Sequence, residues 1–182
     1  TNPNETTYNI CINAWAKSRH PEAPFRAENL LRRMVALGES GTQIEPSEEA
    51  FTAVMNTWIN SNSNLGSKQK IKEATEKVAG ILDLMEHISE TSSSLSLSVV
   101  PYTVLIKAWG KAGQTVNEIE KQKCCDEILN VLSRMRSKGV LATTEVYNSV
   151  ITALAEISPI AAVFYFLELE HQYSDGLLHL DT

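Results

Sequence analysis

One eight-residue pattern occurs four times in this chain and constrains its fold more than any other feature. The copies occupy residues 8–15, 51–58, 102–109 and 147–154. Each copy opens with Tyr or Phe, has apolar residues three and four positions later, and closes with Trp or Leu at position seven. Residues at these spacings share one face of an α-helix. All three tryptophans occupy the closing position, so we predict four copies of one helix with the same buried face.

A second apolar stripe follows each copy, at the same spacing of zero, three, four and seven. Its members are Ala27, Leu30, Leu31 and Met34; Val78, Ile81, Leu82 and Met85; Ile128, Val131, Leu132 and Met135; and Ala162, Tyr165, Phe166 and Leu169. Each unit is therefore predicted to be a helical hairpin with apolar stripes on both helices. A lone hairpin cannot bury both stripes, so the hairpins should stack into an all-α solenoid with one continuous core. The expected units are 4–46, 47–97, 98–142 and 143–182, the last one incomplete or divergent.

Successive opening aromatics lie 43, 51 and 45 residues apart, which is longer than a compact hairpin requires. The excess lies in four polar stretches. They are residues 38–45, 61–72, 89–98 and 110–123. The serine-rich stretch 89–98 is predicted to be a flexible surface loop.

Composition narrows the class of protein. The chain has 182 residues and a formal net charge of −6. Its longest apolar run, 160–167, is far shorter than the roughly 20 residues that cross a membrane, so we predict no membrane insertion. Three cysteines form no disulfide framework, and the adjacent Cys124 and Cys125 lack metal-ligand spacing. Cys11 lies on the apolar face and is expected in the core. The chain starts at Thr1 in mid-pattern, which suggests a portion of a longer protein.

The sequence contains no signature of catalysis. The glycine pairs in 38–41 and 110–113 lack the order of a phosphate-binding loop and a preceding strand. The four histidines, His20, His87, His171 and His179, show no metal-ligand spacing on one helix face. No nucleophile motif is present. We therefore expect no enzymatic activity, no metal and no cofactor.

A different stripe on the first helix of each unit, at positions one, five and nine from the opening aromatic, is entirely polar. Its members are Asn9, Asn13 and Lys17; Thr52, Asn56 and Asn60; Thr103, Lys107 and Lys111; and Asn148, Thr152 and Glu156. The leading residue is always Asn or Thr. A solvated helix face would also be polar, but it would show a wider mixture of residues at each level. Amides and hydroxyls both donate and accept hydrogen bonds, as the edge of a nucleobase requires.

Two segments give the chain a family resemblance. Residues 3–9 resemble the junction before the first helix of pentatricopeptide repeat proteins, and residues 135–140 resemble the end of their second helix. The spacing of Ala27 and Met34 also fits that family. The resemblance covers nearly the whole chain, although the units are longer than the family's usual 35 residues. The Trp-Leu-Gly-Tyr order of tetratricopeptide repeats is absent.

This resemblance implies a right-handed solenoid that binds single-stranded RNA in a mitochondrion or plastid, in RNA processing, stability or translation. Proteins of this type read one base per repeat with two or three side chains. The implied first readers are Asn9, Thr52, Thr103 and Asn148, and the implied second readers are Ser47, Ser98 and Thr143. In that family Asn in the first place favours pyrimidines and Thr favours purines, so the resemblance implies the preference pyrimidine, purine, purine, pyrimidine. Lys17 and Lys111 match a position that approaches the RNA phosphates.

Two observations keep an alternative open. Ser47 and Thr143 also lie where a helix N-cap belongs, and Glu49 and Glu145 precede the opening aromatic by two, where the family often has an aliphatic residue. An acidic chain must also gather its cations on one face to hold RNA.

The alternative is a non-catalytic, protein-binding subunit of a large assembly, for example an organellar ribosome. The last predicted helix supports it, because it is apolar on nearly every side and needs cover. Its cover would be either further repeats or a protein partner. The candidate docking residues are Phe164, Tyr165, Phe166 and Leu167.

Overall fold

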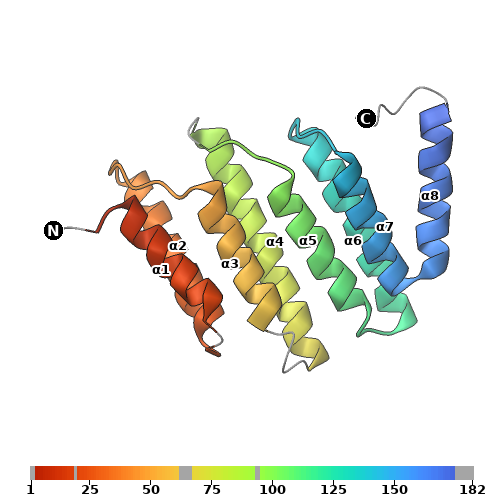
Figure 1. The fold of residues 1–182 in the computed structure, drawn as a ribbon, viewed down its shortest axis with the longest axis horizontal. Coiled ribbons are helices and arrows are strands. Elements are labelled where there is room, and N and C mark those ends of the chain that lie inside the picture. Colours follow the sequence, from red (N-terminus) through yellow and green to blue (C-terminus); the bar gives the residue numbers. More distant parts are fainter. Residues whose placement is uncertain (1–2, 19, 62–66, 93–94, 175–182) are drawn as a thin grey trace. The chain divides into compact units, whose positions relative to one another are not determined.

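The computed structural model describes residues 3–18, 20–61, 67–92 and 95–174, and these residues form eight α-helices with no β-strand among them (Figure 1). In chain order the helices are α1 (Glu5–Lys17), α2 (Ala23–Glu39), α3 (Glu48–Ser61), α4 (Lys68–Thr91), α5 (Val100–Gly113), α6 (Glu118–Ser137), α7 (Thr144–Ile157) and α8 (Pro159–Ser174). They fall into two compact units, Thr1–Leu97 and Ser98–Thr182, called unit 1 and unit 2 below. The prediction of an all-α chain is confirmed.

Asparagine side chains cap the N-termini of two helices. At α1 the Asn4 side-chain oxygen accepts a hydrogen bond from the Thr7 backbone amide at 2.9 Å. The Thr7 hydroxyl in turn accepts one from the Asn4 backbone amide at 3.4 Å. At α6 the Asn117 oxygen accepts from the Glu120 amide at 3.0 Å. These bonds satisfy amides that have no partner inside the helix, which stabilises each start by about 1 kcal/mol.

A glycine ends α6. Gly139 has a φ of 75°, which an L side chain rarely adopts. In this conformation the Val140 amide donates back to the Met135 carbonyl at 3.1 Å, and the Gly139 amide donates to the Arg136 carbonyl at 3.0 Å. The two bonds satisfy carbonyls of the last turn.

Unit 1 consists of two helical hairpins, α1–α2 and α3–α4. Helix α3 packs against both helices of the first hairpin, so that α1 and α3 form one layer and α2 and α4 the other (Figure 1). The predicted apolar stripes supply the core. Its buried members include Tyr8, Ile12, Ala27, Leu31, Met34, Phe51, Val54, Met55, Trp58, Val78, Ile81, Leu82 and Met85.

Unit 2 repeats this plan with the hairpins α5–α6 and α7–α8. Helix α7 packs against both α5 and α6, and α8 packs against α7. The core again follows the predicted stripes. Its buried members include Tyr102, Leu105, Ile106, Ile128, Val131, Leu132, Met135, Tyr147, Val150, Leu154, Ala162 and Tyr165.

Two glycines allow α5 and α7 to approach closely. A Cβ atom on Gly110 would lie 3.0 Å from the Cβ of Ala153, and one on Gly113 would overlap the side chain of Ile157. Both glycines are buried inside or at the end of α5. The glycine pair in 110–113 therefore serves helix packing.

The described helices pair as the hairpins α1–α2, α3–α4, α5–α6 and α7–α8, and the chain divides into its two compact units between Leu97 and Ser98. Within each unit the second hairpin packs on the first, as stacked repeats do. One continuous stack of all four hairpins stays a prediction.

Two expectations about the core need correction. Cys11 is exposed, because α1 packs against α2 and α3 with other residues. Trp58 is buried, but Trp15 and Trp109 are only half-buried. A shared position in the repeat pattern therefore does not give the three tryptophans equal burial.

The predicted loops are shorter than expected. Helix α4 continues to Thr91, into the stretch 89–98, and Leu95 of that stretch is buried. Helix α5 continues to Gly113 and α6 begins at Glu118, so only four residues connect them. Polar side chains do not end a helix by themselves. Residues 62–66 and 93–94 of the predicted loops lie outside the described residues.

Candidate nucleic-acid interface

The polar stripe of unit 1 lies on two helices that pack side by side, α1 and α3. On α1, Asn13 and Lys17 are exposed and Asn9 is half-buried. On α3, Asn56 and Asn60 are exposed and Thr52 is half-buried. None of the six residues is a carboxylate. We call these six residues the unit 1 stripe.

The two first readers of unit 1 differ in their hydrogen bonds. The Thr52 hydroxyl donates to the Glu49 carbonyl at 3.1 Å, one turn earlier in the same helix. The Asn9 carboxamide oxygen is buried and has no hydrogen-bond partner in the protein. A buried acceptor without a partner costs free energy, but the same burial shields this oxygen from a base, so the missing bond does not favour Asn9 over Thr52 as a reader.

The corresponding stripe of unit 2 is less uniform. Thr103 is buried, and its hydroxyl donates to the Val99 carbonyl at 2.8 Å. Thr103 is therefore not available to a base in this structure. Asn148 is exposed, as are Lys107 and Lys111.

The two C-terminal residues of the α7 stripe, Thr152 and Glu156, form hydrogen bonds within the protein. The Thr152 hydroxyl donates to the Asn148 carbonyl at 2.8 Å. The Glu156 carboxylate accepts from the Gln114 side-chain amide at 2.9 Å. Its negative charge would repel a phosphate, so the stripe of unit 2 is less suited to RNA than that of unit 1.

The three implied second readers all lie at helix starts. The Ser47 hydroxyl accepts from the Ala50 amide at 3.4 Å, and the Ser98 hydroxyl accepts from the Val100 amide at 3.1 Å. Thr143 is the N-cap residue of α7, but its hydroxyl makes no capping bond and is buried without a partner. Ser47 thus acts as the cap that its position suggested, and Thr143 caps with its backbone only.

The position two before the opening aromatic carries an exposed residue in all four hairpins: Thr6, Glu49, Val100 and Glu145. Only Val100 offers an aliphatic surface on which a base can stack, and 48% of it is exposed. At Glu49, hydrogen bonds from its own backbone amide and from the Ser47 hydroxyl hold the pKa of the carboxyl below its ordinary value of 4.5. Glu49 is therefore ionised at neutral pH, where it suits a helix N-terminus and opposes a phosphate.

Several arginines and lysines on the second helices are held in ion pairs. Arg26 pairs with Glu22 at 3.0 Å and Arg32 pairs with Glu28 at 2.8 Å. Lys121 pairs with Glu118. Lys17 and Lys107, on first helices, are exposed and lie on the polar stripes.

The predicted docking helix α8 leaves much of its apolar surface open. Phe164 is 70% exposed, Leu167 is 52% exposed and Phe166 is 47% exposed. Tyr165, by contrast, is buried, so it adds little to the exposed apolar surface of α8, although its ring lines a cleft beside α6. Phe166, which the apolar spacing predicted in the core, is exposed because α8 packs against α7 through the side that holds Ala162 and Tyr165. No described helix, α8 included, has the length and apolar character needed to span a bilayer.

A buried carboxylate that the sequence did not reveal connects α2, α3 and α4 of unit 1. Glu28 on α2 is 6% exposed, and its Oε2 accepts a hydrogen bond from the Trp58 indole nitrogen at 3.1 Å. Its Oε1 accepts from Arg32 Nε at 2.9 Å and lies 3.9 Å from Lys77 Nζ. The Phe25 ring meets the Trp58 ring edge to face at a centroid distance of 4.8 Å. A buried charge requires such partners.

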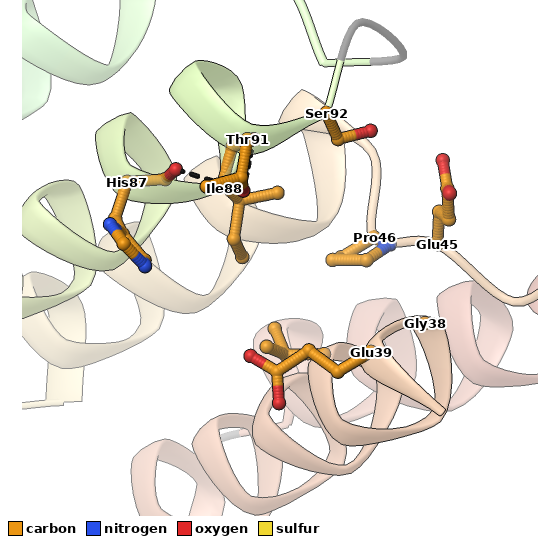
Figure 2. A pocket seen from close by; sticks show the side chains of 9 residues that line it. Gly38, Glu39, Glu45, Pro46, His87, Ile88, Thr91 and Ser92 are labelled. Carbon is orange, nitrogen blue, oxygen red and sulfur yellow. Dashed lines mark hydrogen bonds between the residues drawn. The ribbon is translucent and has the colours of Figure 1, made fainter. Parts of the chain in front are cut away.

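Unit 1 also contains a small pocket of about 220 Å³ between the C-terminal parts of α2 and α4 (Figure 2). Ile88 and Pro46 supply apolar wall, and Glu39 extends from α2 on the opposite side, whereas Glu45 projects away (Figure 2). None of the predicted site residues lines it. It therefore forms no part of the candidate RNA interface.

The two adjacent cysteines of α6 are buried, and burial raises the pKa of both thiols. They are thus protonated at neutral pH, which suits packing and not metal binding. Within the described part of the chain, no three His, Cys, Asp or Glu side chains gather as a metal site.

Neither protein-family models nor curated proteins give a match to this sequence.

Proposed function

We propose that this chain binds single-stranded RNA, without catalysis, as proteins with pentatricopeptide repeats do. The observation that supports the proposal best is the unit 1 stripe, which presents four asparagines, a threonine and a lysine on two neighbouring helices, with four of the six side chains exposed. Asparagine provides both donors and an acceptor, which matches the edges of unstacked bases. The resemblance of residues 3–9 and 135–140 to that family agrees with this role and suggests a mitochondrial or plastid location.

In this proposal the two helices of the unit 1 stripe receive successive nucleotides. Asn9 and Thr52 face the bases, and Lys17 neutralises a phosphate. The implied preference then reduces to a pyrimidine followed by a purine. Thr103 is left out because, unlike the half-buried Thr52, it is buried as well as hydrogen-bonded within its own helix. Asn148 would add a reading position only if the four hairpins form one continuous stack.

Affinity is expected to be modest. Ser47 and Ser98 accept hydrogen bonds from helix-start amides, so they contribute little to discrimination between bases. The net charge of −6 also opposes nucleic acid outside the stripe. The chain should therefore tolerate many sequences and depend strongly on salt.

Two charge insertions test the stripe directly. Asn13→Glu with Asn56→Glu adds two carboxylates at exposed places in its centre. At close range each new charge should oppose a phosphate by about 1 kcal/mol in water, so affinity for a single-stranded RNA should fall at least about tenfold. Fluorescence anisotropy with a labelled 12-mer at low salt measures the change.

The matched control is Asn29→Glu with Ala36→Glu, which adds the same two charges at exposed positions of α2, in the same unit as the stripe. These positions lie on the second helix of the first hairpin and not on the two helices that carry the stripe, and salt screens charges more than about 10 Å apart at 0.1 M. The control should change affinity by less than about twofold. Equal losses in both double variants would show that net charge alone determines binding.

A second candidate function is protein docking through α8, as in a structural subunit of a large assembly. The exposed apolar side chains of α8, with Phe164 at 70% and Ile160 at 69%, favour it. A patch of this kind on a surface helix is typical of a protein-interaction site. Phe166→Glu should weaken such docking and leave RNA affinity unchanged.

A further inference from the structure

A cleft of about 400 Å³ lies in unit 2 between α6 and α8, with Leu154 of α7 among the residues that line it. Its volume is within the range of about 300–1,000 Å³ that ligand sites occupy. The apolar part of the wall includes Leu129, Phe164 and the ring of Tyr165. The Tyr165 hydroxyl is buried and has no partner in the protein. Both α6 and α8 leave apolar side chains exposed here, with Phe164 at 70% and Leu129 at 37%.

The repeat register identifies the equivalent place in unit 1. Aligning the apolar stripes sets Met34 opposite Met135 on the second helices of the first and third hairpins, and Met85 opposite Leu169 on those of the second and fourth. In this register the Phe25, Glu28, Trp58 and Lys77 cluster of unit 1 corresponds to Asp126, Leu129, Leu154 and Ala161 of unit 2. All four of these unit 2 residues line the cleft.

By this register the cleft corresponds to the surroundings of the Trp58 indole in unit 1, with the buried Leu154 at the position of the tryptophan. There Trp58 is 3% exposed, its N–H donates to a carboxylate, and a lysine ammonium lies 5.7 Å from the ring centroid. In unit 2 a smaller Leu154 replaces the indole, and Ala161 replaces the lysine. The side chains that complete the cluster in unit 1 are therefore missing in unit 2.

The charge of the cleft also points to a particular occupant. Its lining includes the carboxylates of Asp126 and Glu168 and no lysine, arginine or histidine. Asp126 accepts a hydrogen bond from the Gln122 side-chain amide at 3.0 Å, which holds its carboxylate in place. An apolar wall beside two carboxylates complements an aromatic group that carries an N–H donor and a neighbouring positive charge.

We propose that this cleft receives a tryptophan side chain, with a lysine or arginine beside it, from a partner protein. The indole would take the place that Trp58 has in unit 1, and the cation would meet Asp126 and Glu168. The proposal specifies the partner chemistry of the second candidate function, protein docking at α8. It does not depend on RNA binding.

Tryptamine is a suitable probe, because it joins an indole to an ammonium group. We expect it to bind the 182-residue chain with a Kd on the order of 1 mM, as a ligand of this size allows. Indole-3-propionate has the same ring with a negative charge and should bind at least about fivefold more weakly, since it meets two carboxylates. Ligand-observed NMR titration measures both. Asp126→Asn should weaken tryptamine about threefold to fivefold.

Leu154→Trp tests the location, because it restores the residue of the other three repeats and places an indole in the cleft. It should raise the melting temperature and abolish tryptamine binding. Leu141→Trp makes the same change at a position that is 83% exposed and does not line the cleft, so it should leave binding unchanged. If Leu154→Trp does not fold, Asp126→Asn still tests the role of the cleft carboxylate, because Asp126 is at an exposed position.

Several results would overturn the proposal. They are no tryptamine binding at 10-fold the expected Kd, undiminished binding by a folded Leu154→Trp chain, and equal binding of indole-3-propionate. Tighter binding of adenosine than of tryptamine would assign the cleft to a nucleobase instead. Leu154→Trp should bind RNA with the same affinity as the wild-type chain. Phe166 does not line the cleft, so Phe166→Glu tests docking on the rest of α8. Failure of the cleft is therefore distinguishable from failure of either proposed function.

Discussion

Replacing Trp58 with alanine should lower the free energy of unfolding by about 3–5 kcal/mol, the usual range for a fully buried aromatic residue. Trp58 is 3% exposed and lies between α2 and α4 in unit 1. Its removal leaves a cavity beside the Phe25 ring and takes one of the hydrogen bonds from the buried Glu28 carboxylate. Guanidinium denaturation followed by circular dichroism measures the loss.

Trp58→Phe separates the ring from its hydrogen bond. Phenylalanine keeps most of the apolar contact but has no N–H to donate to Glu28. A buried acceptor that loses a partner costs about 1–3 kcal/mol, so this variant should fall between the wild-type chain and Trp58→Ala.

Trp15→Ala is the matched control, because Trp15 has the same place in the repeat pattern. It is only half-buried, and its ring contacts His20 at a centroid distance of 6.0 Å. The control should cost clearly less than Trp58→Ala. Equal costs would show that the repeat position, and not the burial seen in the structure, determines the contribution of a tryptophan.

Gly113→Ala and Gly80→Ala should change stability in opposite directions. Alanine at Gly80, exposed in the middle of α4, would place its added Cβ more than 4 Å from atoms beyond the local helix backbone, so it should stabilise the chain by about 1 kcal/mol through helix propensity. The same change at Gly113 would drive a methyl group into Ile157. Overpacking of this kind costs about 1–3 kcal/mol, so Gly113→Ala should destabilise unit 2.

The contact with Ile157 is tested by a double-mutant cycle. Ile157→Val should cost stability alone, but it should recover part of the loss when combined with Gly113→Ala, because the two side chains share one space. Thermal unfolding of the four proteins gives the coupling energy. Additive effects, or a stabilising Gly113→Ala, would contradict the close approach of α5 and α7.

The helices could be predicted from the sequence because the apolar residues recur at helical spacing in both members of every hairpin. That spacing also located most of the core, since stripe residues such as Ile12, Phe51 and Met135 are fully buried. The ends of the helices were harder to predict. Ser89 and Gly110 resemble loop residues in composition, but hydrogen bonding and packing continue the helix past both of them.

The network around Glu28 could not be predicted, because a single Glu in a second helix resembles a solvated residue. Its partner Trp58 lies 30 positions further along the chain, and only the packing of α3 on α2 brings the two together. The Thr103 hydroxyl was missed for a different reason: its partner, the Val99 carbonyl, is only four residues away, but the helical period does not determine whether a threonine hydroxyl bonds to its own helix. The polar stripe itself was visible, since it required only the helical period.

The measurement that tests RNA binding most directly is selection of a random single-stranded RNA pool on the purified chain, at increasing salt. Our account predicts retention that decreases with salt and an enriched pyrimidine–purine step, which Thr52→Asn should shift towards two pyrimidines. The Asn13→Glu, Asn56→Glu variant should retain much less RNA than its control. No retention at low salt, or equal retention by the stripe variant and the wild-type chain, would contradict the account.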